Sequence, residues 1–240
     1  MGYRPVGKTD ATMRRIRTGV GAFHAKLDIL PLMKQDSVNF KADIQPFLQL
    51  PENRAKMLGA TRGGGEFRAV PNFREIPIDD VMIPPKALSG WTVSISSTAL
   101  EVYLRNVMLM GPFEIEASTG AVIAANTIED KHYISNITHI GEMLGNNGFQ
   151  IIDITRCLNS DGLVQALANQ GEGTLPFTFT GNQVEDPVTG LLGSPFRMWF
   201  FDRDGKLLTY DEGEIPDQAD ALAALDESNA KMGSSKYGSK

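Results

Sequence analysis

Short segments in which apolar and polar residues alternate constrain this chain more than any other feature of its sequence. In 91-WTVSISSTAL-100 the odd-numbered positions are mostly apolar, and the even-numbered positions are small and hydroxylated. The hydroxylated residues are Thr92, Ser94, Ser96 and Thr98. Successive side chains of a strand point to opposite faces of a sheet, so the segment predicts a strand with one buried and one polar face.

The same alternation recurs along the chain. A hairpin is predicted where 132-HYISNITHIGEML-144 and 149-FQIIDITRCL-158 flank 145-GNNG-148, because asparagine and glycine tolerate the positive φ angles of hairpin turns. Three further strands are predicted, at residues 22–30, 174–181 and 195–202. Pro176 cannot donate to a ladder, so we expect its strand to lie at a sheet edge or to break there.

Helical signals are few, and the chain contains 24 glycines and 13 prolines. A helix is predicted at residues 216–232 and another is possible at 161–168, while residues 100–110 suit either a short helix or a continuation of the preceding strand. The whole pattern is typical of a mainly β fold: a β-sandwich or half-barrel with one or two short flanking helices, whose strands an oligomer could pool into one large barrel. The predicted organisation is a basic arm (1–20), a β domain (21–205) and a C-terminal extension with a short helix and a flexible tail (206–240).

The charge of the chain is unevenly distributed. The net charge is −6, but the first 20 residues hold five basic side chains and one acidic one, so the remainder is about −10. This balance disfavours a general nucleic-acid-binding surface, and the basic arm is interpreted either as docking on an acidic neighbouring copy or as a nucleic-acid tail. No apolar run approaches the ~20 residues that span a bilayer, and the N-terminus lacks a signal-peptide core.

Residues that could carry chemistry form no recognisable catalytic motif. The run Gly63–Gly65 precedes a strand, whereas a phosphate-binding loop needs a helix after its glycines, so a tight turn or bulge is predicted. The single cysteine, Cys157, follows an apolar run and is predicted to be a buried thiol. The histidines are His24, His132 and His139. The last two are an odd number of positions apart and would face opposite sides of one strand, so no metal or cofactor is expected.

The stretch 57-MLGATRGGGEFRAVPNFREIPIDD-80 resembles a segment of the major tail tube proteins of long, flexible, non-contractile tailed bacteriophages. In that family a glycine-containing turn leads into an alternating strand and then a corner, which is matched here by Pro71, Phe73, Arg74, Glu75, Ile76, Ile78 and Asp79. The family order continues in 90-GWTVSISSTALEVYLRNVML-109, 171-GEGTLPFTFTG-181 and 195-PFRMWFF-201. The resemblance covers about residues 57–202, although the usual acidic-glycine turn after the corner is replaced here.

The resemblance implies a structural virion protein and not an enzyme. Six copies would form a ring, and stacked rings would form a tail tube that conducts DNA; the fold is shared with the ring protein of type VI secretion. Its partners would be further copies of itself and the tape measure, tail-terminator and baseplate proteins, in the host cytoplasm during assembly and then in the virion. Corner or intra-ring contacts would come from Phe73, Arg74, Glu75, Ile76 and Asp79. The hydroxylated strand face named above is a candidate lining of the lumen.

The segment 33-MKQDSVNFKADIQPFLQLPENRAKM-57 is then predicted to be a loop that reaches the next ring. Its inter-ring contact residues would be Phe40, Ile44, Phe47, Leu48 and Leu50. The alternative is an amphipathic helix packed on the chain's own core. Two alternative functions also stay open: another ring of the same fold, such as a tail terminator, baseplate hub or secretion tube, and a jelly-roll metalloenzyme that uses the three histidines.

Overall fold

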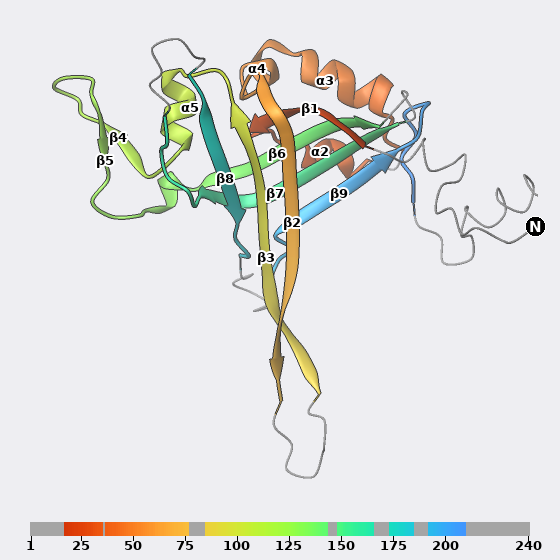
Figure 1. Ribbon diagram of the computed structural model, residues 1–240. Coiled ribbons are helices and arrows are strands. Elements are labelled where there is room, and N and C mark those ends of the chain that lie inside the picture. Colours follow the sequence, from red (N-terminus) through yellow and green to blue (C-terminus); the bar gives the residue numbers. More distant parts are fainter. Residues whose placement is uncertain are drawn as a thin grey trace, which may run out of the picture. The chain divides into compact units, whose positions relative to one another are not determined.

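The computed structural model of the chain describes residues 17–35, 37–76, 85–143, 148–165, 173–184 and 192–209, with only the backbone described for 17–20 and for Met143 (Figure 1). The chain divides into two units, Met1–Leu207 and Leu208–Lys240, and the first is described below. The predicted helix at 216–232 and most of the basic arm lie outside the described residues.

Seven strands form one antiparallel sheet. They are β1 (Arg17–Ala25), β2 (Thr61–Glu75), β3 (Lys86–Ala99), β6 (Ile134–Met143), β7 (Phe149–Asn159), β8 (Leu175–Gly181) and β9 (Phe196–Phe201). The strand order is β1-β6-β7-β8-β3-β2, with β9 paired to β7. The mainly β prediction is confirmed, as is the hairpin of β6 and β7, in which Ile137 lies opposite Ile154.

Strand β7 belongs to both halves of the sheet. Its first part, Phe149–Ile154, pairs with β9, and its last part, Cys157–Asn159, pairs with β8. Between them Arg156 has a φ angle of 46°, a left-handed conformation that turns the strand from one neighbour to the other. In Figure 1, β2, β3 and β8 cross the direction of β1, β6, β7 and β9, so the sheet folds over on itself as a sandwich.

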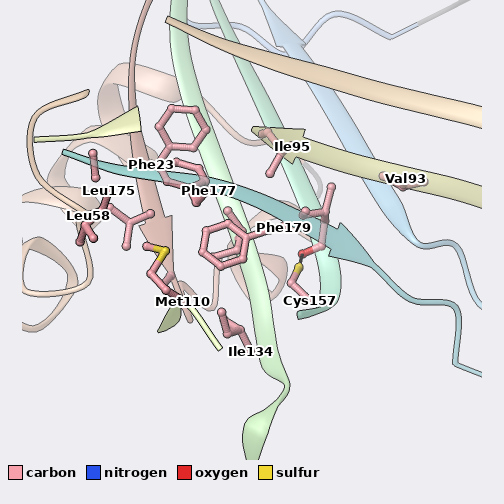
Figure 2. Packing of buried hydrophobic residues seen from close by; sticks show 14 residues of the cluster. Phe23, Leu58, Val93, Ile95, Met110, Ile134, Cys157, Leu175, Phe177 and Phe179 are labelled. Carbon is pink, nitrogen blue, oxygen red and sulfur yellow. Dashed lines mark hydrogen bonds between the residues drawn. The ribbon is translucent and has the colours of Figure 1, made fainter. Parts of the chain in front are cut away.

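The main core lies between these two halves (Figure 2). The apolar faces predicted from alternation are buried: Val93 and Ile95 of β3 are 0% and 2% exposed. Phe177 of β8 meets Phe23 of β1 edge to face, with ring centroids 5.4 Å apart. Each fully buried side chain of this size contributes about 1.5–3 kcal/mol, so the crossing of the halves is held by ordinary apolar burial.

Short helices cover part of the opposite side of the sheet. They are α2 (Leu30–Met33), the π-helix η1 (Phe40–Ile44), α3 (Gln45–Gln49) and α4 (Pro51–Arg54). The Asn39 side chain starts η1 by accepting hydrogen bonds from the backbone N–H groups of Lys41 and Ala42, at 2.9 and 3.1 Å. Phe40 then stacks on Phe149 of β7 with ring centroids 3.9 Å apart, within a second core cluster.

The remaining elements lie outside the large sheet. They are α5 (Leu104–Leu109), β4 (Phe113–Ile115), β5 (Val122–Ala124) and the 3₁₀ turn η2 (Asp130–His132). Of the two alternatives for residues 100–110, a short helix or a strand continuation, the structure has the helix, α5. Of the helix predicted at 161–168, residues 161–165 are not helical and the others lie outside the described residues. Within the described ranges, no helix has the length and apolar character that a membrane crossing requires.

Two strand predictions differ in detail from the structure. The first strand was predicted over 22–30, but β1 ends at Ala25 because Lys26 takes a left-handed φ of 61°. Strand β8 lies inside the sheet, not at its edge. The ladder between β8 and β7 ends before Pro176, so β3 is the described strand that flanks this proline. The missing N–H of Pro176 therefore interrupts no hydrogen bond to a second strand.

Candidate assembly surfaces

The hairpin of β2 and β3 continues past the rest of the sheet as a two-stranded arm, defined here as residues 71–76 and 85–91 (Figure 1). Strand β8 pairs with β3 only from Val93 onward, so among the described residues no third strand lies beside the arm. Phe73 lies directly opposite Leu88, and these side chains are 60% and 53% exposed. Ile76, at the end of the arm, is 41% exposed. The arm therefore presents large apolar side chains to its surroundings.

The corner predicted at residues 71–79 is wrong for its described part. Strand β2 runs straight through Pro71, which pairs with Trp91, and continues to Glu75. A register shift between Asn72 and Phe73 gives the arm a bulge instead of a corner. The proline is tolerated because β2 lies at the sheet edge, where a missing N–H breaks no second ladder. Asp79 lies outside the described residues.

The other corner residues lie on the arm. Arg74 is placed opposite Ala87, and Glu75 is placed opposite Lys86. Adjacent residues of a strand face opposite sides, so Arg74 and Glu75 do not share a face. Glu75 and Lys86 bring opposite charges across the ladder, as expected for a pair on neighbouring strands.

The outer edge of β2 is open in the described sheet, because β2 ends the strand order. Such an edge presents backbone N–H and C=O groups that can pair with a strand of another chain. The glycine run lies on this edge strand: Gly63 and Gly64 have φ angles of 78° and 77°, and the register shifts between Arg62 and Gly65. The prediction of a turn or bulge is therefore confirmed. A Cβ on Gly65 would meet the ring of Phe23 at 2.7 Å, so a side chain is excluded there.

The hydroxylated face of β3 is polar, as predicted. In the ladders Ser94 lies between Arg68 and Thr180, and this row faces away from the buried Val93. The full set on β3 is Thr92, Ser94, Ser96 and Thr98. Their partners on β8 include Thr178 and Thr180, and those on β2 include Arg62, Glu66 and Arg68. The face thus combines hydroxyl groups with few and mixed charges.

The segment predicted to reach another ring instead folds as helices against the chain's own core. Phe40 and Ile44 are only 5% and 0% exposed, so their prediction as inter-ring contacts is wrong. Phe47 and Leu48 are partly buried against the second core cluster, to which Phe40 and Ile44 belong. This packing agrees with the alternative prediction, an amphipathic segment packed on the chain's own core. Leu50 is 42% exposed, and its contact with another copy stays a prediction.

The three histidines have separate environments. His24 is buried, its Nδ1 has no hydrogen-bond partner, and burial lowers its pKa to about 4, with a further contribution from the charge of Arg105. His139 packs edge-on against Phe23, with ring centroids 4.6 Å apart. Within the described part of the chain, no three His, Cys, Asp or Glu side chains are grouped so that they could hold a metal ion.

Cys157 is buried, as predicted. Its Sγ donates to the Ile154 carbonyl at 3.2 Å, and burial raises the pKa of the thiol. Cys157 is therefore a neutral thiol within the core.

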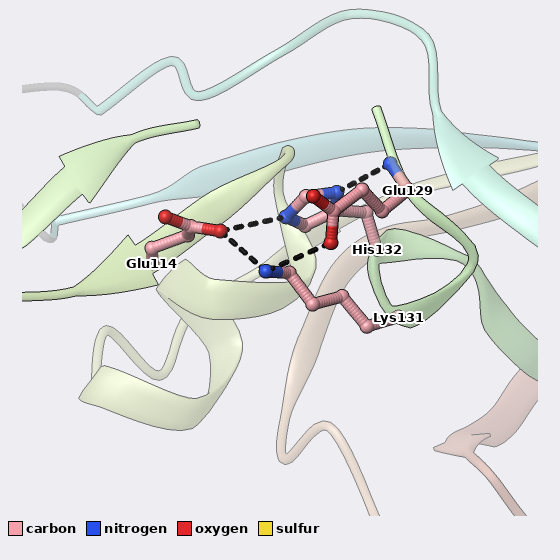
Figure 3. A network of polar contacts seen from close by, with 4 residues as sticks. All are labelled: Glu114, Glu129, Lys131 and His132. Carbon is pink, nitrogen blue, oxygen red and sulfur yellow. Dashed lines mark hydrogen bonds and ion pairs between the residues drawn. The ribbon is translucent and has the colours of Figure 1, made fainter. Parts of the chain in front are cut away.

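The sequence analysis missed a polar network that joins β4 to η2 (Figure 3). Lys131 Nζ lies 2.6 Å from Glu114 Oε1 and 3.0 Å from Glu129 Oε2. The hydrogen bond and the charge of Lys131 lower the pKa of Glu114, and the same contacts raise the pKa of Lys131. The only local signal is a capping box in which His132 stands three residues after Glu129, where glutamate or glutamine is usual.

Comparison with known proteins gives no indication of the function, which must be inferred from the residues of this chain. No protein-family model matches the chain, and a search of curated proteins finds no match. What the geometry offers is an open strand edge, an apolar arm and a polar sheet face on one chain. Open strand edges and exposed apolar patches are features that often mark contact surfaces.

Proposed function

We propose that this chain is a structural subunit whose copies form six-membered rings, and that the rings stack into a tube for DNA like that of the major tail tube proteins it resembles in sequence. The observation that carries the proposal is the arm. Its exposed Phe73, Ile76 and Leu88 lie on two strands without a third strand beside them. A two-stranded hairpin is at best marginally stable alone, so contact with a partner would stabilise it.

A second copy of the chain fits as that partner. In the assembly, the open edge of β2 and the arm would each contact a different surface of another copy, so the contacts between copies would be head-to-tail. Head-to-tail contacts close into rings or repeat as filaments, and a tube needs both. Strand pairing at the edge would join copies within a ring, and the arm would contact the next ring. Tape measure, tail-terminator and baseplate proteins would then be its further partners.

The hydroxylated face supports passage of DNA rather than its retention. Each phosphate that a lysine or arginine neutralises adds affinity by releasing counterions, and such contacts would slow the movement of DNA. Around Ser94 and Ser96, β2 contributes two arginines and one glutamate, and Asp161 lines the same hollow as Ser96, so the described positive and negative charges balance. A lumen lined by this face would therefore bind DNA weakly. The protein would act in the virion after assembly in the host cytoplasm.

The test is assembly of the purified protein, followed by sedimentation and negative-stain microscopy. The wild type should form rings and tubes at high concentration. Ile76→Asp, which alters the arm and not the β2 edge, should form rings that do not stack, with unchanged circular dichroism. Ile123→Asp is the matched control, because Ile123 has the same 41% exposure but lies on β5, away from the arm. Wild-type rings that do not stack would indicate a terminal ring instead. A wild type that is monomeric at every concentration would contradict the proposal, as would normal tubes of Ile76→Asp.

A further inference from the structure

A small cavity of about 200 Å³ lies between the end of β1, helix α5 and the turn η2. Four of its lining residues can carry positive charge: Lys26, Arg105, Lys131 and His132. The other lining residues are Ala25, Met108, Leu109, Gly111, Phe113, Tyr133 and Ile134. No carboxylate is among them. Donors from three separate elements therefore converge on one space.

The positive charge at this cavity is only partly neutralised. Among the described residues no carboxylate forms an ion pair with Lys26 or Arg105, whereas Lys131 is paired with two glutamates. The Arg105 guanidinium donates to backbone carbonyls after α4, including that of Lys56 at 2.7 Å. Those carbonyls hold the guanidinium in place, but they do not cancel its charge. An anion in the cavity would meet two unpaired cations.

His132 adds a directed donor. Its Nδ1 accepts a hydrogen bond from the Glu129 backbone N–H at 2.9 Å, so in the neutral ring the proton is on Nε2. The side chain is only 4% exposed, and Nε2 has no hydrogen-bond partner. The dashed line from the ring to Glu114 in Figure 3 marks a longer charge contact. The nearest carboxylate oxygen, on Glu114, is 3.8 Å away, beyond hydrogen-bonding distance. Buried donors are normally satisfied, so this atom indicates a missing acceptor.

We propose that this cavity binds a small oxyanion, a phosphate or a carboxylate. Lys26 and Arg105 supply the charge, and the Nε2–H of His132 donates to one oxygen of the ligand. No acid is among the lining residues, and the nearby Glu114 carboxylate is already paired with Lys131, so the lining favours an anion over a cation or a neutral polar group. The volume is below the ~300–1,000 Å³ of pockets for larger ligands, so the ligand is a single small group. This site uses none of the residues of the arm or of the β2 edge.

The experiment is calorimetric titration of inorganic phosphate into dispersed, full-length protein at constant ionic strength. The wild type should bind one phosphate per chain, and Lys26→Gln should weaken the affinity about tenfold, as expected for loss of one charged hydrogen bond. Lys86→Gln removes the same charge on the arm and should leave the affinity unchanged. Equal binding by the two lysine variants would overturn the site, as would a wild-type affinity weaker than about 1 mM.

A second pair of variants tests the histidine. His132→Asn keeps an acceptor near the Nδ1 position and removes the Nε2 donor, so phosphate binding should weaken. His132→Gln places an amide donor near the Nε2 position and should retain binding. If both histidine variants lose phosphate binding together with their native circular dichroism, they are unfolded. The comparison of Lys26→Gln with Lys86→Gln then tests the site. Native spectra with unchanged binding in His132→Asn would contradict the role of Nε2.

The source of the oxyanion is found in the same preparation. Phosphate released on denaturation and measured by ion chromatography would identify a free ion as the natural ligand. Dissociation of oligomers by phosphate in light scattering, absent in Lys26→Gln, would identify a carboxylate on a second copy. Either result supports the site, and both are distinguishable from a failure of tube assembly, because phosphate binding is measured on the dispersed chain.

Discussion

Acidification should destabilise the protein through His24, a buried histidine that the fold holds in its neutral form. Its pKa is about 4 in the folded chain and 6.5 in a solvated one, because burial disfavours the charged ring. Between these values the unfolded chain binds a proton that the folded chain does not, so stability falls as the pH falls. A difference of about 2.5 pH units corresponds to about 3 kcal/mol.

The assay is urea denaturation at several pH values from 7 to 4, with His24→Leu as a variant that cannot titrate at this position. The variant is needed because burial raises the pKa of Asp153, which makes stability change in the opposite direction over acidic pH. The stability of the wild type relative to the variant should fall by about 3 kcal/mol across the window. A difference that stays constant from pH 7 to 4 would refute the assignment of a neutral, desolvated His24.

Three further predictions concern folding and the arm. Ile44→Ala should lower the free energy of unfolding, measured by urea denaturation, by about 2–5 kcal/mol because Ile44 is fully buried. Leu50→Asp should change it by less than about 0.5 kcal/mol, and equal effects of the two variants would contradict the helical packing. Cys157 should react with a thiol reagent only as fast as the chain unfolds, and rapid modification of native protein would contradict its burial. Glu75→Arg should weaken the arm by about 0.2–1 kcal/mol through repulsion of Lys86 and impair assembly, and unchanged tubes would show that the pair is merely solvated.

Local pattern was sufficient to predict most of the sheet. The alternation around Val93 and Phe177 survives in the structure because one face of each strand packs against the other half of the sandwich. The arm could not be predicted, because Pro71 suggests that the strand breaks there. The proline is tolerated because β2 lies at the edge of the sheet, and that position depends on how the other strands pair. The apolar residues near Phe40 suit a core or a partner equally, and the choice depends on Phe149, far along the chain.

Among the candidate surfaces, too, only those set by local sequence could be predicted. The hydroxylated face was visible in the sequence, since period two alone separates Ser94 from Val93. The oxyanion cavity was not, because Lys26, Arg105 and His132 come from three distant segments and no spacing rule connects them. Tertiary contacts create such a site, so only the folded chain reveals it.

The sharing of β7 between the two halves of the sheet has a consequence for how the chain folds during synthesis. The β2–β3 hairpin is local, whereas the partner strand of β1 in the sheet is β6, more than a hundred residues later. The crossing itself waits for β7, β8 and β9, which come later still. Long-range pairing of this kind slows folding, and the nascent chain carries an apolar arm throughout the delay. We therefore expect a cell that expresses this protein to need chaperones for it in proportion to its rate of translation.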